Sequence, residues 1–233
     1  MRSGRWALPV ITAACVLAPC MLLAVNSPSA RQPEVRLPEP QTSGGMSLAE
    51  ALTKRRSQKA FVSKPLSTKQ VSQLCWAAQG ITDKERGLRT APSAMALYAI
   101  HVFIVDDRGA HEYLPQPHTL RNLSVDGALD RLRMAVGQAS VESAPLSMVL
   151  AMEPARLEAR CGKNAERYSL IEAGHVAQNV LLQATAMGVA SVPVGGIDEG
   201  KVAAALDLPA GMRPVYVLPI GHPSAKIQGS PVK

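Results

Sequence analysis

The chain has 233 residues, of which 47% are hydrophobic and 3% aromatic, and its formal net charge is +7. This apolar content predicts one globular domain with a buried core and argues against a disordered chain. Few aromatic side chains are available to stack on bases, so we expect no nucleic-acid partner.

The first thirty residues have the layout of a targeting segment. Arg2 and Arg5 precede a mostly apolar run from Trp6 to Val25. A secretory signal peptide has this arrangement, and the run is also long enough to remain as a membrane anchor. Both alternatives predict an exported protein, either periplasmic or anchored facing the periplasm. Any membrane contact is expected only through residues 1–30.

Prolines and glycines are frequent between residues 26 and 45. Such composition is typical of a connecting segment. We therefore predict a linker at 31–45, a single domain at 46–226 and a short tail at 227–233.

Two helix starts are visible early in the domain. Ser47 and Glu50 form a capping box that opens a helix to about residue 55, and Ser67 with Gln70 opens a second helix. Gly80 is placed to end that second helix.

Later elements follow from hydrophobic periodicity and turn residues. Strands are predicted at 98–105, 110–114, 148–152, 190–194 and 215–220, and helices at 126–136, 167–187 and 198–206. Residues 106–109 read as a hairpin turn, and Gly188 should end the long helix. Mixed helices and strands with a hairpin predict an α+β fold.

Three short segments have side chains or backbone suited to chemistry. Arg55 to Phe61 concentrates cations at a helix end, which suits either an anionic ligand or the helix dipole alone. The turn Pro92-Ser93-Ala94 precedes a strand and could present a hydroxyl or simply reverse the chain. Pro193 to Gly196 places two glycines after a buried strand, where backbone can approach a ligand closely.

Other polar and sulfur-containing residues favour structural interpretations. Glu172 and His175 lie in the long helix and are expected to be satisfied core or interface residues. Met95, Met148 and Met187 are interpreted as core residues. Cys75 and Cys161 could pair if they meet, and no spacing of His and Cys indicates a metal site.

Taken together, the three segments resemble the nitroreductase superfamily over residues 46–226. The matching motifs are Arg55-x-Ser57-x-Lys59-x-Phe61, Pro92-Ser93-Ala94, Glu172-Ala173-Gly174-His175, Pro193-Val194-Gly195-Gly196 and Pro219-Ile220-Gly221-His222-Pro223. The branch that looks most similar contains the thiazole- and oxazole-forming oxidases.

This resemblance implies an α+β homodimer whose long central helix lies at the dimer interface, with FMN in each of two interface sites. It also assigns roles to individual residues. Arg55 and Lys226, helped by Arg56, would hold the FMN phosphate, while Ser57 and Lys59 would face the isoalloxazine or ribityl chain. Pro92, Ser93 and Ala94 would come from the partner subunit, and Pro193, Val194, Gly195 and Gly196 would line the ring near N5.

Lys59 and Lys163 are the catalytic residues that the resemblance implies. An ammonium group from Lys59 near N1 and O2 would stabilise the anionic reduced flavin. Lys163 matches the lysine of a Lys-Tyr pair in the azole-forming branch, but Asn164 stands where that branch has tyrosine. Met95 likewise stands where a glycine is common.

The expected function is an FMN-dependent oxidoreductase that transfers a hydride between flavin N5 and a small organic substrate. The departures at Met95 and Asn164 leave open a non-catalytic FMN-binding or carrier protein. A third alternative is an exported binding domain without flavin.

Overall fold

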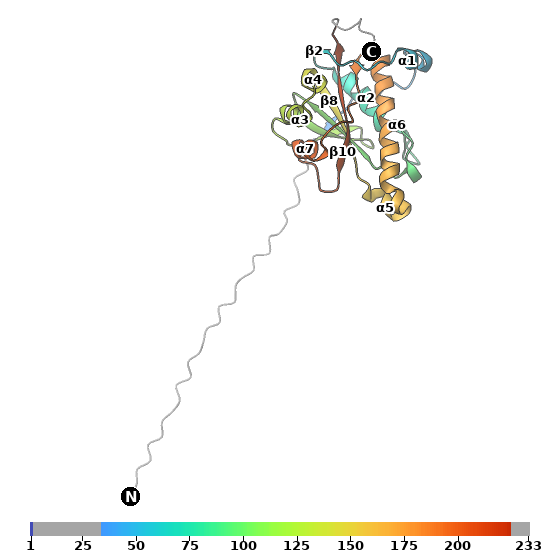
Figure 1. The fold of residues 1–233 in the computed structure, drawn as a ribbon. Helices are drawn as coiled ribbons and strands as arrows, with labels where there is room; N and C mark the ends of the chain where they lie inside the picture. Colours follow the sequence, from blue (N-terminus) through green and yellow to red (C-terminus); the bar gives the residue numbers. More distant parts are fainter. Residues whose placement is uncertain (2–33, 225–233) are drawn as a thin grey trace. The chain divides into compact units, whose positions relative to one another are not determined.

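The computed structural model of the protein describes Met1 and residues 34–224. Lys226, the predicted tail and the predicted targeting segment beyond Met1 lie outside these residues. Within the described part, no helix is long and apolar enough to cross a membrane. Residues 34–224 belong to the structural unit that begins at Gln32 (Figure 1).

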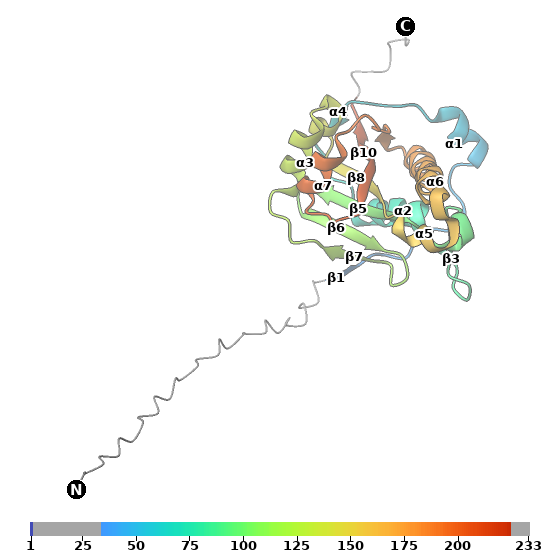
Figure 2. The ribbon, with the colours of Figure 1, turned by 60° about the horizontal axis from the view of Figure 1, so that its bottom comes forward.

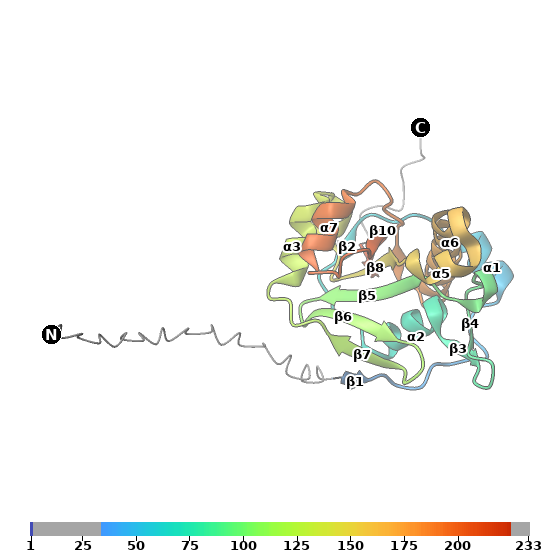
Figure 3. The same ribbon diagram turned by 90° about the horizontal axis from the view of Figure 1, so that it is seen from below.

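An antiparallel sheet forms the centre of this unit. Its spatial order is β1 (Glu34–Arg36), β7 (Thr119–Asn122), β6 (Gly109–Leu114), β5 (Ile100–Asp106), β8 (Leu146–Met152), β10 (Arg213–Pro223) and β2 (Phe61–Val62). The short strand β9 (Ala190–Ser191) also pairs with β10. Figure 3 shows β5, β6 and β7 side by side, and the predicted turn at 106–109 closes the β5–β6 hairpin.

Helices lie on both sides of the sheet (Figure 2). They are α1 (Leu48–Lys54), α2 (Thr68–Gln79), α3 (Ala128–Val136), α4 (Ala139–Ser143), α5 (Ala155–Cys161), α6 (Ala165–Ala186) and α7 (Glu199–Ala205). A small hairpin of β3 (Ile81–Asp83) and β4 (Leu88–Arg89) follows α2, and 3₁₀ turns η1 (Ala94–Ala96) and η2 (Gly162–Asn164) precede β5 and α6.

The alternation of side chains along β5 divides the core into two layers. Val102 and Ile104 pack in the cluster that includes α2 and α6, whereas Phe103 and Val105 pack in the cluster that includes α3 and α7. Successive residues of a strand point to opposite faces, so residues 102–105 of β5 are all apolar because both faces of the strand are covered there. The α+β fold predicted from the sequence is confirmed.

Both predicted capping boxes are present, at Ser47–Glu50 and at Ser67–Gln70. Gly80 ends α2 as predicted, but with an extended backbone rather than a left-handed one. A Cβ atom at Gly80 would lie 2.2 Å from the ring of Trp76. Glycine is therefore required here by close packing and not by its backbone conformation.

The segment predicted as a linker differs from the expectation. Residues 34–36 form β1 at the edge of the sheet, and Leu37 is buried in the core. The Ser72 hydroxyl donates to the carbonyl oxygen of Pro38, which fastens this stretch to α2. The proline and glycine content predicted a linker, but the segment packs against the domain through the buried side chain of Leu37.

Candidate functional site

The basic segment at 55–59 lies directly beside the strand that leads to the two glycines. Ser57 forms a parallel bridge with Ser191, and the amide of Gln58 donates to the carbonyl oxygen of Ser191 at 3.0 Å. Parallel pairing means that the two segments run in the same direction at this point. The first and third sequence motifs are therefore neighbours within one chain.

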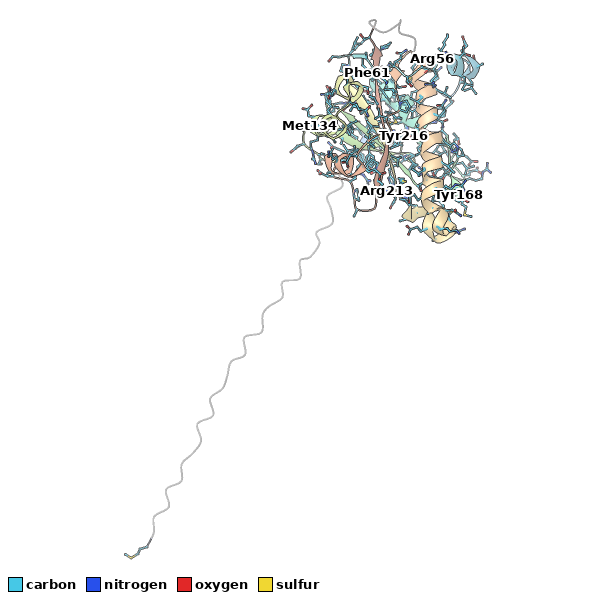
Figure 4. The ribbon with its side chains drawn as sticks, viewed as in Figure 1. Arg56, Phe61, Met134, Tyr168, Arg213 and Tyr216 are labelled. Carbon is cyan, nitrogen blue, oxygen red and sulfur yellow. The ribbon has the colours of Figure 1, made fainter. Side chains whose placement is uncertain are left out.

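Strand β10 positions both segments. Ser191 pairs with Ile220, and Val194 exchanges two backbone hydrogen bonds with Val217. Figure 4 shows Arg56 and Phe61 at one end of β10, Tyr216 in the middle and Arg213 toward the other end. The path from Ser191 to Gly196 thus follows the strand from the basic segment toward its centre.

Gly221 explains how closely these pieces approach. A Cβ atom there would lie 2.7 Å from Pro145 and 3.0 Å from Cβ of Phe61. Just beyond, the amide of Ser224 donates to the carbonyl oxygen of Ala60. The described chain therefore ends next to the residue after Lys59, while Lys226 itself lies outside the described residues.

The cations of this segment have no acidic partners. Arg55 is half-buried and Arg56 and Lys59 are exposed, and no carboxylate of residues 34–224 pairs with any of them. Arg213, by contrast, is neutralised by two glutamates. The segment therefore keeps a local positive charge that can attract an anion.

The Arg56 side chain also caps the C-terminal end of α1. Its guanidinium donates to the carbonyl oxygens of Thr53 and Arg55 at the end of α1. A cation at a helix C-terminus satisfies orphan carbonyls and complements the helix dipole. Of the two arginine side chains, only that of Arg55 lacks a hydrogen-bond partner among the described residues.

The glycine pair presents open backbone beside Tyr216. Gly195 and Gly196 are both exposed, whereas Val194 is buried and Pro193 half-buried. A Cβ atom at Gly195 would come within 3.3 Å of the Tyr216 ring, and one at Gly196 would meet nothing within 4 Å. Space in front of Gly196 remains free for a ligand to contact the main chain.

The second motif lies elsewhere in the chain. The Ser93 hydroxyl donates to Glu172 in α6 at 2.6 Å and accepts from the amide of Tyr98. Glu172 precedes the end of α6 at Ala186 by fourteen residues, or roughly 20 Å along the axis at 1.5 Å per residue. One chain therefore does not bring Pro92, Ser93 and Ala94 to the basic segment, which contacts the strand after α6.

The Lys163 side chain is likewise remote from Lys59 within one chain. Lys163 is exposed in η2, at the start of α6, and borders a shallow hollow with Arg167, Leu170 and Ile171. Leu170 and Ile171 are 48% and 46% exposed, which is unusual for adjacent large apolar residues in a helix.

Comparison with known proteins identifies the family. The family model described as the nitroreductase family matches residues 52–222. The chain belongs to the nitroreductase family. A Methanocaldococcus jannaschii protein named as a candidate nitroreductase is 32% identical over 196 residues, which cover 81% of this chain and 96% of that protein.

Solved structures agree with this assignment and with the fold. A Ralstonia eutropha JMP134 protein described as a candidate nitroreductase has a TM-score of 0.77 at 31% identity, covering 85% of this chain and 92% of its own. The NADPH:FMN oxidoreductase of Vibrio harveyi, complexed with NAD⁺, has a TM-score of 0.58 at 22% identity, covering 79% and 72%. The nitroreductase-like fold is therefore confirmed, and family membership indicates a flavin-type oxidoreductase.

Some residues that the sequence analysis interpreted as core or interface residues differ from that expectation in the structure. Met148 is buried as predicted, but Met95 is 65% exposed with φ of +53°. The turn η1 reverses the chain there and directs Met95 outward, so the core interpretation is wrong. His175 is exposed in the single chain, so its core interpretation is wrong and its interface interpretation stays a prediction, while Glu172 is buried as expected.

The two cysteines do not pair. Cys75 is a buried free thiol in α2, and burial raises its pKa well above the usual range. Cys161 is a free, half-buried thiol at the end of α5. Neither thiol lies in the segments described above.

A cavity of about 570 Å³ does not coincide with the predicted site. It lies between residues 39–46, α2 and the end of α6. No predicted site residue lines it. Residues 39–45 were assigned to the linker, and no motif in them indicated a cavity.

Proposed function

We propose that this nitroreductase binds FMN and transfers a hydride between flavin N5 and a small organic substrate. The observation that carries the proposal is the cluster of unneutralised cations at Arg55 to Lys59, which the Ser57–Ser191 bridge holds beside the strand that leads to the exposed Gly195 and Gly196. An anionic phosphate and a flat ring are the two features that such an arrangement suits. The likeness to the Vibrio harveyi NADPH:FMN oxidoreductase supports the cofactor.

FMN, when bound, supplies the two-electron chemistry, and the protein supplies placement and charge. Arg55 would hold the phosphate because its guanidinium has no competing partner among the described residues. Lys226 remains a proposed second phosphate ligand. Lys59 would place an ammonium group near the pyrimidine edge, and Ser57 would face the ribityl chain or the ring.

The glycines would act through their main chain. Gly196 has open space in front of it, so its backbone can meet a ring without a side chain intervening. Pro193 and Val194 would form the adjoining wall, with Val194 fixed by its bonds to Val217. These residues exclude water from one side of the ring and leave the substrate side open.

A homodimer would complete the site. Pro92, Ser93 and Ala94 lie about 20 Å along α6 from the basic segment of their own chain, so the proposal assigns them to the partner's flavin. An antiparallel pairing of two α6 helices would bring the start of one helix to the end of the other. The exposed Leu170 and Ile171 would be covered in that pairing, and Lys163 would approach the partner's site.

The finer placement in the azole-forming branch remains a proposal that rests on the motifs. Lys163 supports it, while Asn164 in place of tyrosine separates this chain from that branch. Export by the N-terminal segment is also proposed, on the order of Arg2, Arg5 and the apolar run.

Titration of the purified protein with FMN and with riboflavin tests the proposal. Riboflavin lacks the phosphate, so Arg55→Gln should weaken FMN binding about tenfold or more and leave riboflavin binding unchanged. Arg160→Gln, at an exposed arginine of α5, is the matched control and should change neither. Absence of flavin absorption from protein incubated with FMN would refute the proposal.

An FMN carrier is the alternative, favoured by the outward Met95 in a turn where the family often has glycine. Reduction and reoxidation of the bound flavin with a panel of donors and acceptors distinguish the two. Sustained turnover with any pair removes the carrier.

A further inference from the structure

A second cavity, of about 280 Å³, lies at the ends of β5 and β6. None of its lining residues belongs to the proposed flavin segments. Its apolar lining residues are Ile100, Val102, Tyr113, Leu114, Pro115 and Pro117. Polar residues also line it, among them Arg89.

Arg89 is only partly satisfied by the protein. Its guanidinium carbon lies 4.2 Å from the centre of the Tyr98 ring, and one nitrogen reaches the side-chain oxygen of Gln79 at 3.5 Å. Its Nε is buried and has no partner among the described residues. Burial, as the main cause, lowers the pKa of Arg89. A guanidinium has five N–H donors, so most of its hydrogen-bonding capacity is unused here.

The carboxylates near Arg89 form hydrogen bonds with other residues. Glu112 bonds to His101 at 2.8 Å and to Arg121, and these bonds outweigh the effect of burial and lower its pKa. Glu172 is separated from Arg89 by Gln79, whose amide donates to Glu172 at 3.1 Å.

Arg156, the other arginine of the cavity, is paired with Glu153. Arg89 is therefore the cation of this cavity that forms no salt bridge with a carboxylate of the described residues, although the charge of Glu172 acts on it from beyond Gln79. A partly buried charge without a directly bonded counter-ion is costly unless a ligand supplies one.

We propose that this cavity binds a small organic carboxylate. Its two oxygens would accept hydrogen bonds from the Arg89 guanidinium, because the planar fork of arginine matches a carboxylate. Its apolar body would pack on Tyr113, Leu114 and Pro117. The volume corresponds to roughly nine water molecules at about 30 Å³ each, which suits a single-ring acid. This inference is independent of the proposed flavin chemistry.

Benzoate is the probe, titrated into the full chain by calorimetry and by NMR. We expect saturable binding with a Kd of about 1 mM or tighter and shifts of the amide signals of Tyr113, Leu114 and Gln116. Benzamide, which has the same ring without the charge, should bind at least tenfold more weakly because the charge-assisted bonds are lost.

Two variants and one control test the location. Arg89→Gln should reduce affinity for benzoate about tenfold or more. Gln116→Glu places a competing carboxylate at the exposed rim of the cavity, leaves Arg89 and its packing untouched, and should also weaken binding. Ala210→Glu adds the same charge at an exposed turn outside the cavity and should have no effect.

The proposal is overturned if benzoate does not saturate, or if both cavity variants bind it as the parent does. It is also overturned if inorganic phosphate binds in an Arg89-dependent way while benzoate does not, since the ligand would then not be an organic carboxylate.

Discussion

The Ser93 hydroxyl donates a 2.6 Å hydrogen bond to Glu172, and this bond fastens the turn before β5 to the middle of α6. Glu172 is 1% exposed and accepts three further bonds, from the Gln79 side chain and from the amides of Ala99 and Ile100. A buried carboxylate with four donors organises its surroundings, because each donor would be unsatisfied without it.

Replacing Glu172 should therefore be costly. Glu172→Ala leaves four donors without an acceptor and should lower the free energy of unfolding by about 3 kcal/mol or more. Ser93→Ala removes one donor and should cost about 1 kcal/mol. Glu158→Ala, on the exposed side of α5, is the control and should change stability by less than about 0.5 kcal/mol. Urea unfolding measures all three, and equal losses for Glu172 and Glu158 would contradict the role described.

A substitution at Gly196 tests FMN binding separately from folding. Gly196→Ala adds a methyl group that meets nothing in the chain within 4 Å, so stability should be retained while FMN binding weakens. Gly200→Ala is matched to it, in the exposed first turn of α7, and should stabilise the helix by about 0.5–1 kcal/mol without affecting FMN. Unchanged FMN affinity in Gly196→Ala would remove Gly196 from the site.

Lys59 should set the flavin potential. Lys59→Met removes an exposed charge, so the fold should be unaffected and the bound flavin should become harder to reduce. Lys64→Met removes an equally exposed charge a few residues away and should leave the potential near that of the parent. Spectroelectrochemical titration compares them, and identical midpoint potentials for both variants would count against the role of Lys59.

The exposed apolar pair on α6 should hold two copies of the chain together. Leu170→Glu with Ile171→Glu should convert a dimer to a monomer, because the new carboxylates would be buried in the helix pair without partners. FMN binding should fall at the same time, since the partner's turn at 92–94 would be lost. Met134→Glu, at a 77% exposed residue of α3, is the control. Light scattering of the three proteins decides, and a double variant that remains dimeric with bound FMN would exclude this interface.

The sequence predicted the local structure of this fold well where side chains act on their own backbone. Both capping boxes, the 106–109 hairpin and the long helix follow from residues close together in the chain. It predicted poorly what depends on distant partners. Leu37 is buried because β1 pairs with β7, more than eighty residues away, and nothing near residue 37 signals that contact.

The site shows the same division. The motif at Arg55 to Phe61 and the glycines at 195–196 were recognisable from sequence, and the structure pairs the first motif with Ser191, on the strand that leads to the glycines. The four donors around Glu172 were not predictable, because they come from α2, the turn before β5 and β5 itself. Met95 was misjudged because hydrophobicity alone does not reveal a left-handed backbone.

His118 should make stability depend on pH. Its Nδ1 lies 2.9 Å from the Tyr113 hydroxyl, and its Nε2 lies 2.8 Å from Ser72 Oγ and 3.1 Å from the carbonyl oxygen of Pro38. The neutral ring satisfies these contacts by donating from Nε2 and accepting at Nδ1. Burial, the main cause, lowers the pKa of His118 in the folded state.

Since the folded pKa lies below the unfolded value of about 6.5, the unfolded chain binds the proton first as the pH falls. The stabilisation is therefore complete above about pH 6.5 and is lost as the pH falls toward the folded pKa. His111 is also buried with a lowered pKa and adds to the same slope.

Urea unfolding measured from about pH 6.5 down to the folded pKa of His118 should show a free energy of unfolding that decreases as the pH falls. His118→Asn should make this dependence on pH weaker, and the contribution of His111 should remain. Because His118 contacts the carbonyl oxygen of Pro38, acid should also speed amide exchange in residues 34–37 before it affects β5. Stability independent of pH in this window, or exchange that rises first in β5, would mean that protonation of His118 does not release the edge of the sheet.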